Sequence, residues 1–328
     1  MTVLVTGGSG LVGSHVIEAL RAAGEPVRAL VRRPGQVEGA ELVVGDVTDP
    51  AVWRRAAVGV RGIVHAAALV APRAPFAEFE RVNVGGTRLA VETARATGAR
   101  LVHVSSVAVY GRTAAYAASR GGSAVDEDFP FQHLSERDYY ARTKRLAEEL
   151  VRDEAARGGL SAVAIRPNVI YGERDRLFTS RLIQAVRLGI VPQVGPGTNH
   201  LSCVYAGNVA AAIVAALELT GPGFRAYNVT ADAAPALTQR EFIGAFAEAL
   251  GVRLRRVPVP LIVAQLGVKV WTRWLRLTRP KRYAGLASAA VWFLVGENPY
   301  SAARAQQDLG WAPPFDARAA IRRTVAGF

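Results

Sequence analysis

The sequence contains little cysteine, and its few histidines are scattered. A single cysteine, Cys203, excludes an internal disulfide and any cluster of cysteine metal ligands. The five histidines do not recur at the short spacings that metal ligands show. We therefore expect no metal site, and the lack of disulfides fits a protein of a reducing, cytoplasmic compartment.

The apolar segments of the C-terminal region are too short to cross a bilayer. The uncharged run Tyr283–Gly296 falls below the ~20 residues that a membrane-spanning helix needs, and Leu261–Val268 is shorter still. The first strand-like run, Thr2–Thr6, follows Met1 directly, which leaves no room for an export signal. We expect no spanning helix and a cytoplasmic location.

Acidic residues are outnumbered, 27 against 40 basic ones, so the 328-residue chain has a formal net charge of +13. The arginines are spread along many expected helices and do not form a basic block. An Arg-rich and Ala-rich genome composition would give the same charge. We therefore expect no nucleic-acid partner and a small-molecule substrate instead.

Short β-branched runs alternate with helical stretches over the first two-thirds of the chain. This alternation predicts an α/β fold of the Rossmann type, a doubly wound parallel sheet that helices cover on both faces. The expected strands are 3–5, 27–31, 41–44, 62–66, 101–105 and 160–165, and the expected helices are 11–23, 50–58, 76–97 and 138–156.

The pattern changes after Gly172. The remaining segments are mostly helical, with brief strand candidates at 202–205 and 226–229, and the Trp-bearing stretch 258–294 shows no strand rhythm. We expect a dinucleotide-binding Rossmann core over 1–172 and a smaller, mainly helical substrate-binding lobe over 173–328. The 202–229 region is expected to return to the core.

A glycine-rich segment joins the first strand to the first helix, with the sequence Thr6-Gly7-Gly8-Ser9-Gly10-Leu11-Val12-Gly13. Glycines at such a junction allow a tight turn and a close approach of a diphosphate to backbone amides, while the helix N-terminus attracts the anion. An ordinary tight turn is the alternative, but the position after the first strand favours a dinucleotide site. We expect the cofactor to contact Gly7, Gly8, Gly10, Leu11, Val12 and Gly13.

Charged residues after the second and third strands bear on the choice of cofactor. Arg32 and Arg33 stand where NAD-selective sites usually present an acidic residue to the ribose, and arginine suits a 2′-phosphate. We therefore favour NADP(H) over NAD(H), although a pair of solvated charges would look the same. Asp46, followed by Val47, is placed to contact the adenine, or to cap a turn.

Tyr140 and Lys144 are candidates for proton transfer. Their spacing of four places both side chains on one face of the expected helix. A phenol with a pKa near ~10 can act as an acid–base catalyst at neutral pH when an adjacent ammonium lowers that pKa. The same pair also occurs by chance in ordinary helices.

Ser105 and Ser106 end a strand at the sheet edge where a doubly wound fold gathers its site. A hydroxyl there can donate a hydrogen bond to a substrate oxygen. A serine after a strand can instead bond to the local backbone as a cap, and this alternative is more credible for Ser105 than for Ser106. Ser106, Tyr140 and Lys144 thus form the expected catalytic set.

In combination these motifs resemble the extended short-chain dehydrogenase/reductases, the NAD-dependent epimerase/dehydratase superfamily. Further matching segments are 45–46, 65–68, 83–87, 105–111, 140–144, 166–172 and 308–313. The resemblance implies that Ser106 is the catalytic hydroxyl, because it lies five residues before Gly111. It also implies a homodimer formed through the helices 76–97 and 138–156. The further cofactor contacts that it implies, with ordinary packing as the alternative, are Ala66, Ala67, Ala68, Asn83, Pro167 and Val169.

Two departures from the family pattern narrow the chemistry. Dehydrating members resemble one another in placing Asp and Glu after the catalytic hydroxyl, where this chain has Val107 and Ala108. Members that act on nucleotide sugars usually carry an Arg-Asp pair where this chain has Leu201 and Ser202, so that diphosphate clamp is lost. Dehydration is therefore disfavoured, and sugar-nucleotide chemistry is less well supported.

Residues 204–210 and the apolar C-terminal segments look more like the 3β-hydroxysteroid dehydrogenase-like branch of the superfamily. That likeness implies a hydrophobic substrate, either sterol-like or a long-chain β-hydroxy or β-keto compound, whose alcohol and ketone forms are interconverted. A nucleotide-sugar 4-epimerase or reductase, and a non-catalytic NADP-binding regulatory or assembly protein, are the alternatives. The segment 258–296 and its basic neighbours fit a substrate pocket, a peripheral membrane contact, or an ordinary core or subunit contact.

Overall fold

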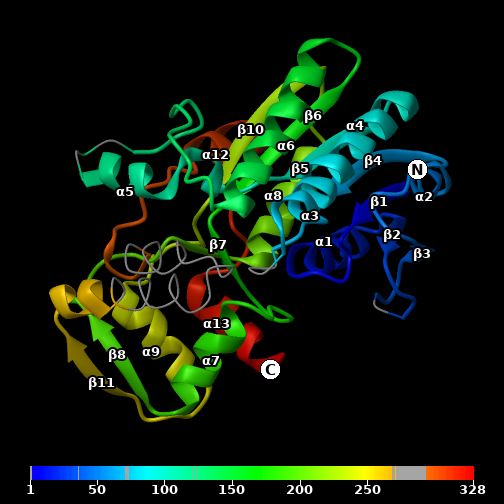
Figure 1. Ribbon diagram of the computed structural model, residues 1–328. Coiled ribbons are helices and arrows are strands. Elements are labelled where there is room, and N and C mark those ends of the chain that lie inside the picture. The colour runs from blue at the N-terminus through cyan, green and yellow to red at the C-terminus, as the bar shows by residue number, and fades with distance from the viewer. Residues whose placement is uncertain are drawn as a thin grey trace.

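A seven-stranded parallel sheet forms the centre of the computed structural model, which describes residues 2–35, 37–70, 74–120, 122, 124–267, 270 and 293–328 (Figure 1). The strand order is β10-β6-β5-β4-β1-β2-β3. The bounds are β1 Thr2–Thr6, β2 Val27–Val31, β3 Glu41–Val44, β4 Val60–His65, β5 Arg100–Val104, β6 Ser161–Pro167 and β10 Gly223–Val229. The order turns back at β1, which starts the chain between β4 and β2. The doubly wound parallel sheet predicted from the sequence is confirmed.

Each face of this sheet has its own apolar core, because alternate strand residues point to opposite faces. Val3 and Val5 pack with α1 and α8 on one face, and Leu4 packs with α2, α4 and α6 on the other. The helix bounds are α1 Leu11–Ala22, α2 Pro50–Ala56, α4 Gly86–Thr97, α6 Tyr139–Ala156 and α8 Ala206–Leu217. Helices on both faces explain why the strands read as continuous apolar runs.

The helix expected over 76–97 has an irregular middle. It consists of α3 (Phe76–Phe79), a π-helical segment η1 (Glu80–Gly85) and α4. Thr87 donates a hydrogen bond from its hydroxyl to the Asn83 carbonyl at 2.6 Å, inside this segment. Wide turns of this kind often occur at functional sites, and this one carries the Asn83 side chain described below.

The C-terminal half adds a second lobe with a separate core (Figure 1). Its elements are β7 Val169–Tyr171, α7 Thr179–Arg187, β8 Ile190–Val194, β9 Cys203–Tyr205, α9 Gln239–Ala249, β11 Arg255–Val259 and α13 Ala317–Ala326. Tyr171, Phe242, Phe246 and Ile321 pack at its centre. Further small elements are η2 Val107–Tyr110, α5 Arg112–Arg120 and α12 Ala303–Leu309.

The parallel pair β8–β11 was not predicted from the sequence. Strand β11 reads Arg-Arg-Val-Pro-Val and is exposed along most of its length, so it lacks the apolar run of a buried strand. Most of the apolar stretch 258–296, including Trp271, Trp274, Trp292 and the basic residues between 269 and 282, lies outside the described residues. Among the described residues, no helix combines the length and apolar character needed to cross a bilayer.

Candidate active site

The glycine loop closes tightly against the end of the neighbouring strand β4. Gly7 has a φ of 70°, and the Gly10 amide donates to its carbonyl at 2.8 Å. A Cβ atom added to Gly7 would lie 2.8 Å from the Ala67 nitrogen, and one added to Gly13 would overlap the Gly7 carbonyl. The loop therefore accepts no side chain at Gly7 or Gly13, as a site for close backbone approach to a diphosphate requires.

Thr6 fastens the glycine loop to the segment after β4. Its hydroxyl bonds to the His65 ring nitrogen Nδ1 at 2.9 Å and accepts from the Ala67 amide at 3.2 Å. Thr6 is completely buried. Sequence reasoning did not single out this threonine. The available signal was a hydroxyl residue in the last position of the first strand, directly before the loop.

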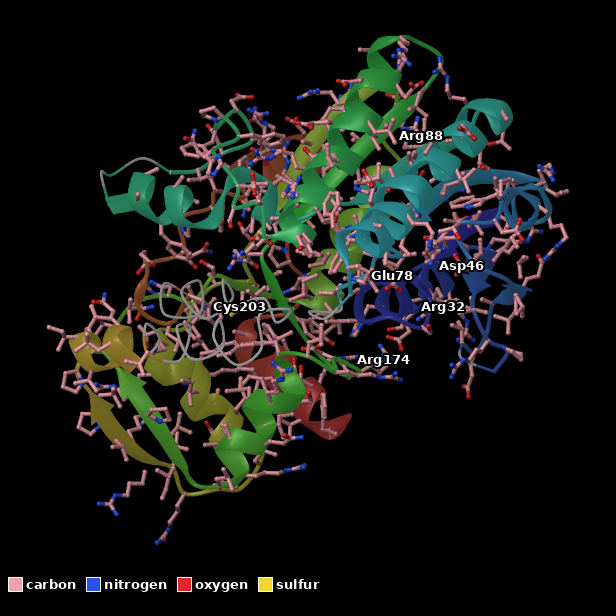
Figure 2. The ribbon with its side chains drawn as sticks, in the orientation of Figure 1. Arg32, Asp46, Glu78, Arg88, Arg174 and Cys203 are labelled. Carbon is pink, nitrogen blue, oxygen red and sulfur yellow. The ribbon has the colours of Figure 1, made fainter. Side chains whose placement is uncertain are left out.

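Asp46 follows β3 and forms a turn with Thr48. Its carboxylate accepts from the Thr48 amide at 2.9 Å and from the Thr48 hydroxyl at 2.8 Å. Burial raises the pKa of Asp46, but these bonds and the charges of Arg81 and Arg32 outweigh that effect, so its pKa is lowered. Arg32 and Arg33 are exposed after β2, and Figure 2 shows Arg32 and Asp46 at the same end of the sheet.

Val47 is held in place by a buried indole. Trp53 donates from Nε1 to the Val47 carbonyl at 2.7 Å, and both side chains are buried. The hydrogen bond satisfies the indole nitrogen and fixes the backbone after Asp46. The backbone of residues 46–47 is therefore held in place by this hydrogen bond, close enough to Arg32 for its charge to act on Asp46.

Asn83 connects the loop after β4 to helix α6. Its Oδ1 accepts from the Leu69 amide at 2.7 Å, and its Nδ2 donates to the Leu69 carbonyl at 3.2 Å and to the Thr143 hydroxyl at 3.0 Å. The side chain is buried. Residues 66–69 are therefore held at one end by Thr6 and at the other by Asn83.

Lys144 is buried at the end of β5. It is 3% exposed, and its ammonium donates to the Val104 carbonyl at 2.6 Å. Burial lowers its pKa to about 8, although the charge of Glu148 opposes that shift. Tyr140 lies one turn earlier on α6 and is partly buried. Asp138 caps this helix by accepting from the Ala141 amide at 3.1 Å, which fixes where the turn that carries Tyr140 begins.

Two histidines near Lys144 are kept neutral. Burial, and then the charge of Lys144, lower the pKa of His65 to about 3, and the pKa of His103 is lowered for the same reasons. Their rings stack with centroids 5.9 Å apart. Because neither histidine carries charge at neutral pH, the Lys144 ammonium is the cationic group among these three side chains.

The local cap forms at Ser106 and not at Ser105. Ser106 is the residue that caps, since its hydroxyl accepts from the Ala108 amide at 3.2 Å, whereas Ser105 donates to the Glu148 carboxylate. The cap reading was the more credible one for Ser105, but Ser105 bonds to Glu148 of α6 instead, because that carboxylate lies within reach. The Ser106 hydroxyl acts as an acceptor in this cap, so it can still donate its proton to another group.

A buried ion pair that sequence reasoning missed lies behind the serines. Arg166 donates from Nε to Glu148 at 3.0 Å and from Nη1 to the Tyr110 hydroxyl at 2.5 Å. The side chains of Arg166 and Glu148 are 5% and 3% exposed. The pair joins β6 to α6 and, through Glu148, holds Ser105. The available signal in the sequence was that Glu148 lies one helical turn after Lys144, which places its carboxylate on the same face of the helix.

Pro167 and Val169 lie where β6 leaves the sheet. Pro167 is buried beside Val229 in the β6–β10 register, and the Val169 amide donates to the Ser202 carbonyl at 3.1 Å. Between them, Asn168 donates to the Thr230 carbonyl at 3.0 Å. This segment therefore connects the sheet to the second lobe.

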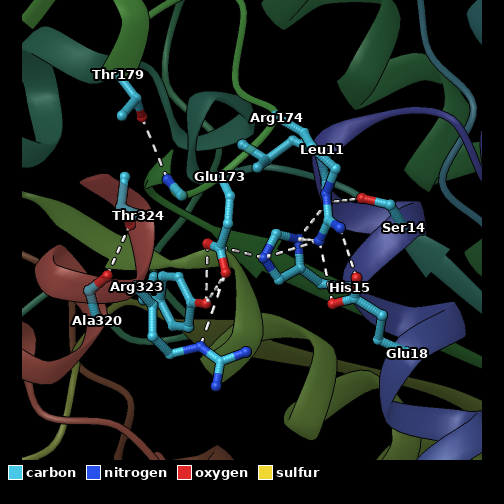
Figure 3. Close-up of polar contacts among 12 residues, drawn as sticks. Leu11, Ser14, His15, Glu18, Glu173, Arg174, Thr179, Ala320, Arg323 and Thr324 are labelled. Atoms are coloured by element: carbon cyan, nitrogen blue, oxygen red, sulfur yellow. Dashed lines mark hydrogen bonds and ion pairs between the residues drawn. The ribbon is translucent and has the colours of Figure 1, made fainter. Parts of the chain in front are cut away.

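Glu173 ties the second lobe to the helix that follows the glycine loop (Figure 3). It bonds to His15 Nε2 at 3.2 Å and accepts from the Tyr205 hydroxyl at 2.7 Å. Burial raises its pKa, but these hydrogen bonds dominate and bring it down to about 2. Arg174, with a φ of 71°, donates to Glu18 of α1 at 3.1 Å. Glu173 was not singled out from the sequence.

A cavity of about 700 Å³ lies along β10 on a different part of the surface. Its lining includes Phe131, Phe224, Tyr227 and Arg304. It contains none of the residues of the glycine loop or of the Ser106, Tyr140 and Lys144 set.

A parallel sheet with a glycine loop after its first strand is the frame of dinucleotide-binding enzymes. The model of the NAD dependent epimerase/dehydratase family matches residues 3–230. The 4-hydroxy-2-methyl-3-oxo-4-farnesyl-3,4-dihydroquinoline-1-oxide ketoreductase of Stigmatella aurantiaca is 34% identical, over 95% of this chain and 92% of the relative. A 3 beta-hydroxysteroid dehydrogenase/Delta 5-->4-isomerase of Mycobacterium tuberculosis is 32% identical, over 97% of this chain and 88% of the relative.

Among solved structures, the chain is similar to MoeE5 in complex with UDP-glucuronic acid and NAD. The TM-score is 0.74 and the identity 26%, covering 100% of this chain and 98% of that chain. The chain belongs to the NAD dependent epimerase/dehydratase family, and it is an NAD-dependent enzyme of the extended short-chain dehydrogenase/reductase type.

Proposed function

We propose that this enzyme interconverts a secondary alcohol and a ketone on a hydrophobic substrate, with hydride transfer to or from C4 of a nicotinamide cofactor. The observation that carries the proposal is the burial of Lys144 with its ammonium on the Val104 carbonyl, two residues before Ser106. Tyr140 lies one turn away on the same helix. A cation, a phenol and a hydroxyl are the set that ketone reduction needs.

In this proposal each of the three side chains has one task. The Tyr140 hydroxyl gives its proton to the substrate oxygen during reduction and takes it back during oxidation. The Ser106 hydroxyl donates a hydrogen bond to the same oxygen. The positive charge of the Lys144 ammonium stabilises the phenolate form of Tyr140, and the ammonium holds the cofactor ribose. When bound, the nicotinamide supplies or accepts the hydride.

The fit to a dinucleotide rests on the cradle formed by Gly7 and Gly13, which a Cβ atom would fill. We propose NADP(H) over NAD(H), with the exposed Arg32 and Arg33 binding the 2′-phosphate. The other proposed cofactor contacts are Gly8, Gly10, Leu11, Val12, Asp46, Val47, Ala66, Ala67, Ala68, Asn83, Pro167 and Val169. The matching test compares the NADP⁺ and NAD⁺ affinities of wild type and Arg32→Asp, and an unchanged ratio would contradict the assignment.

A hydrophobic substrate is supported by the relatives and by the residues of the second lobe. The names of the two relatives contain a farnesyl quinoline and a steroid. Leu201 and Ser202 occupy the positions where members that act on nucleotide sugars usually carry an Arg-Asp pair. Both residues are buried, and the Ser202 hydroxyl accepts from Tyr116 at 3.0 Å. We propose a sterol-like or long-chain β-hydroxy or β-keto substrate, bound between a cofactor core over 1–172 and the lobe over 173–328.

The second candidate is a nucleotide-sugar epimerase, favoured by the similarity to a structure that holds UDP-glucuronic acid and NAD. An epimerase would interconvert a UDP-sugar with no net change in cofactor absorbance. The proposed reductase would oxidise NADPH in the presence of a long-chain β-keto ester or a ketosteroid. The two activities are therefore separated by one absorbance measurement.

The catalytic assignment is tested with two neighbouring tyrosines. Tyr140→Phe is expected to lower kcat for ketone reduction by roughly 10²–10⁴-fold, the usual contribution of a proton donor. The matched control is Tyr139→Phe, whose ring packs against Phe76 and Phe79. It should keep its activity, and both variants should bind NADPH as wild type does. Full activity in Tyr140→Phe would remove the phenol from the mechanism.

We also propose a homodimer formed through α4 and α6, which pack side by side in the fold (Figure 1). Leu146 of α6 is 41% exposed, which suits a contact that is completed by a second subunit. Light scattering of wild type and Leu146→Arg tests this: the variant should have the mass of one chain. A wild-type mass of one chain would rule the dimer out.

A further inference from the structure

The outer face of the β8–β11 pair is apolar and exposed. The register places Pro192 beside Val257, and Ile190 beside Arg255, on one face of this small sheet. Ile190 is 55% exposed, Val257 42%, and Leu188, just before β8, 79%. The opposite face of β8 is buried through Val191 in the core of the second lobe. An isolated exposed apolar residue is ordinary, but Ile190 and Val257 on this face, with Leu188 two residues before Ile190, form a patch.

The helical residues 261–267 directly follow β11 (Figure 1) and carry further exposed apolar side chains. Ile262 is 65% exposed, Val263 53% and Leu266 52%. With 3.6 residues per turn, these three side chains lie within an arc of about 100°. A surface helix of a globular protein normally turns its apolar stripe inward. Here the apolar stripe faces outward.

Arginines surround this surface, and acidic residues are absent from the segments that form it. Arg187, Arg253 and Arg255 are exposed. The sequence has no Asp or Glu from 176 to 217 or from 249 to 296. On the neighbouring helix α9, Glu241 bonds to Thr238 and Glu248 pairs with Arg318 at 3.3 Å. The surface therefore combines exposed apolar side chains with a positive charge that its own segments do not neutralise.

We propose that this face docks on an anionic phospholipid bilayer. The apolar side chains enter the boundary between headgroups and acyl chains, and the arginines meet the lipid phosphates. A second copy of the chain is a poorer occupant, because a two-fold contact would bring the same arginines against one another. This inference does not depend on the proposed function, since binding to lipid requires neither cofactor nor substrate.

The experiment is sedimentation of the full chain with vesicles of phosphatidylcholine alone or mixed with phosphatidylglycerol. Wild type is expected to bind the mixed vesicles, and more weakly as salt rises. The double variant Leu188→Ser/Ile190→Ser should bind at least about tenfold more weakly, since it removes two exposed apolar side chains. Each of Arg253→Gln and Arg255→Gln should weaken binding by roughly fivefold.

Matched controls carry the same changes on the opposite end of the molecule. Val44→Ser/Val58→Ser removes two apolar side chains that are 43% and 69% exposed. Arg54→Gln and Arg88→Gln each remove one exposed charge, and Figure 2 shows Arg88 on helix α4, far from β11. These variants should bind the vesicles as wild type does.

Three outcomes would overturn the proposal. In the first, wild type does not bind the mixed vesicles. In the second, the control variants weaken vesicle binding as much as the variants of the proposed face do. In the third, wild type self-associates without lipid, and Leu188→Ser/Ile190→Ser abolishes that association. The last outcome would identify the face as a subunit interface. Reduction of a short, water-soluble ketone by Leu188→Ser/Ile190→Ser should equal that of wild type, so failed docking and failed catalysis are told apart.

Discussion

Lys144 is expected to make the cofactor-free protein less stable at neutral pH than at alkaline pH. The side chain is 3% exposed, and burial lowers its pKa from 10.5 to about 8. Between these two values the unfolded chain binds more protons than the native one, so the free energy of unfolding rises with pH. From pH 7 to pH 9.5 the gain from this one group is about 2 kcal/mol.

The variant that isolates this effect is Lys144→Met, which keeps the length of the side chain and cannot take a charge. Urea unfolding of wild type and variant is measured at several pH values over this range, and the difference cancels the titration of groups that both proteins share. That difference should move in favour of wild type by about 2 kcal/mol between pH 7 and pH 9.5. The Val104 carbonyl loses its donor in the variant at every pH. This loss changes the difference in the free energy of unfolding by the same amount at every pH, so the slope of that difference with pH is unchanged.

The matched control is Arg142→Met, two residues earlier on α6. Its guanidinium donates to the Glu136 carbonyl at 2.8 Å and stays charged throughout the range, so its difference from wild type should be flat with pH. A flat difference for Lys144→Met as well would refute the reasoning, because the ammonium would then titrate at its ordinary pKa. The same titration predicts that kcat/KM for ketone reduction falls above about pH 8.

Three further variants test the contacts around the site. Glu148→Gln should lower the free energy of unfolding by about 3–5 kcal/mol, because it leaves the Arg166 guanidinium buried without a charged partner; a loss below 1 kcal/mol in urea would contradict this. Gly13→Ala should weaken NADPH binding at least about tenfold, since its Cβ meets the Gly7 carbonyl; a fluorescence titration with wild-type affinity would show that the loop can relax. Glu173→Gln should cost roughly 3 kcal/mol at pH 7. That stability is lost as pH falls from 4.5 towards 2, so the gap between wild type and variant must narrow in acid unfolding, and a constant gap would argue against the low pKa.

The elements that could be predicted from the sequence are those with a strong local pattern. The strands 27–31 and 41–44 were predicted with the bounds that the structure has. The first is almost wholly buried and the second lies at the edge of the sheet, but both carry a short apolar run. The helix expected over 138–156 begins and ends as predicted, since Asp138 is a favourable cap. The glycine loop was predictable for the same reason, because its constraint lies within eight consecutive residues.

The missed elements lack such a pattern. Strand β11 is exposed and contains two arginines and a proline, so nothing in its sequence distinguishes it from a loop until β8 pairs with it. The π-helical turn at Asn83 is likewise invisible, because the contact that it serves, with Thr143, joins residues 60 positions apart. Spacing along the chain carries no information about such contacts.

The sequence by itself therefore determined the parallel sheet, the glycine loop and the spacing of Tyr140 and Lys144 on one helix, since each shows as a local pattern of neighbouring residues. Only the tertiary structure decided which serine caps and which bonds to Glu148, that Lys144 is buried, and that an apolar face of the second lobe turns outward. The hydrogen bonds of the two serines, the burial and lowered pKa of Lys144, and the exposure of the apolar face all depend on which segments pack together in the folded chain.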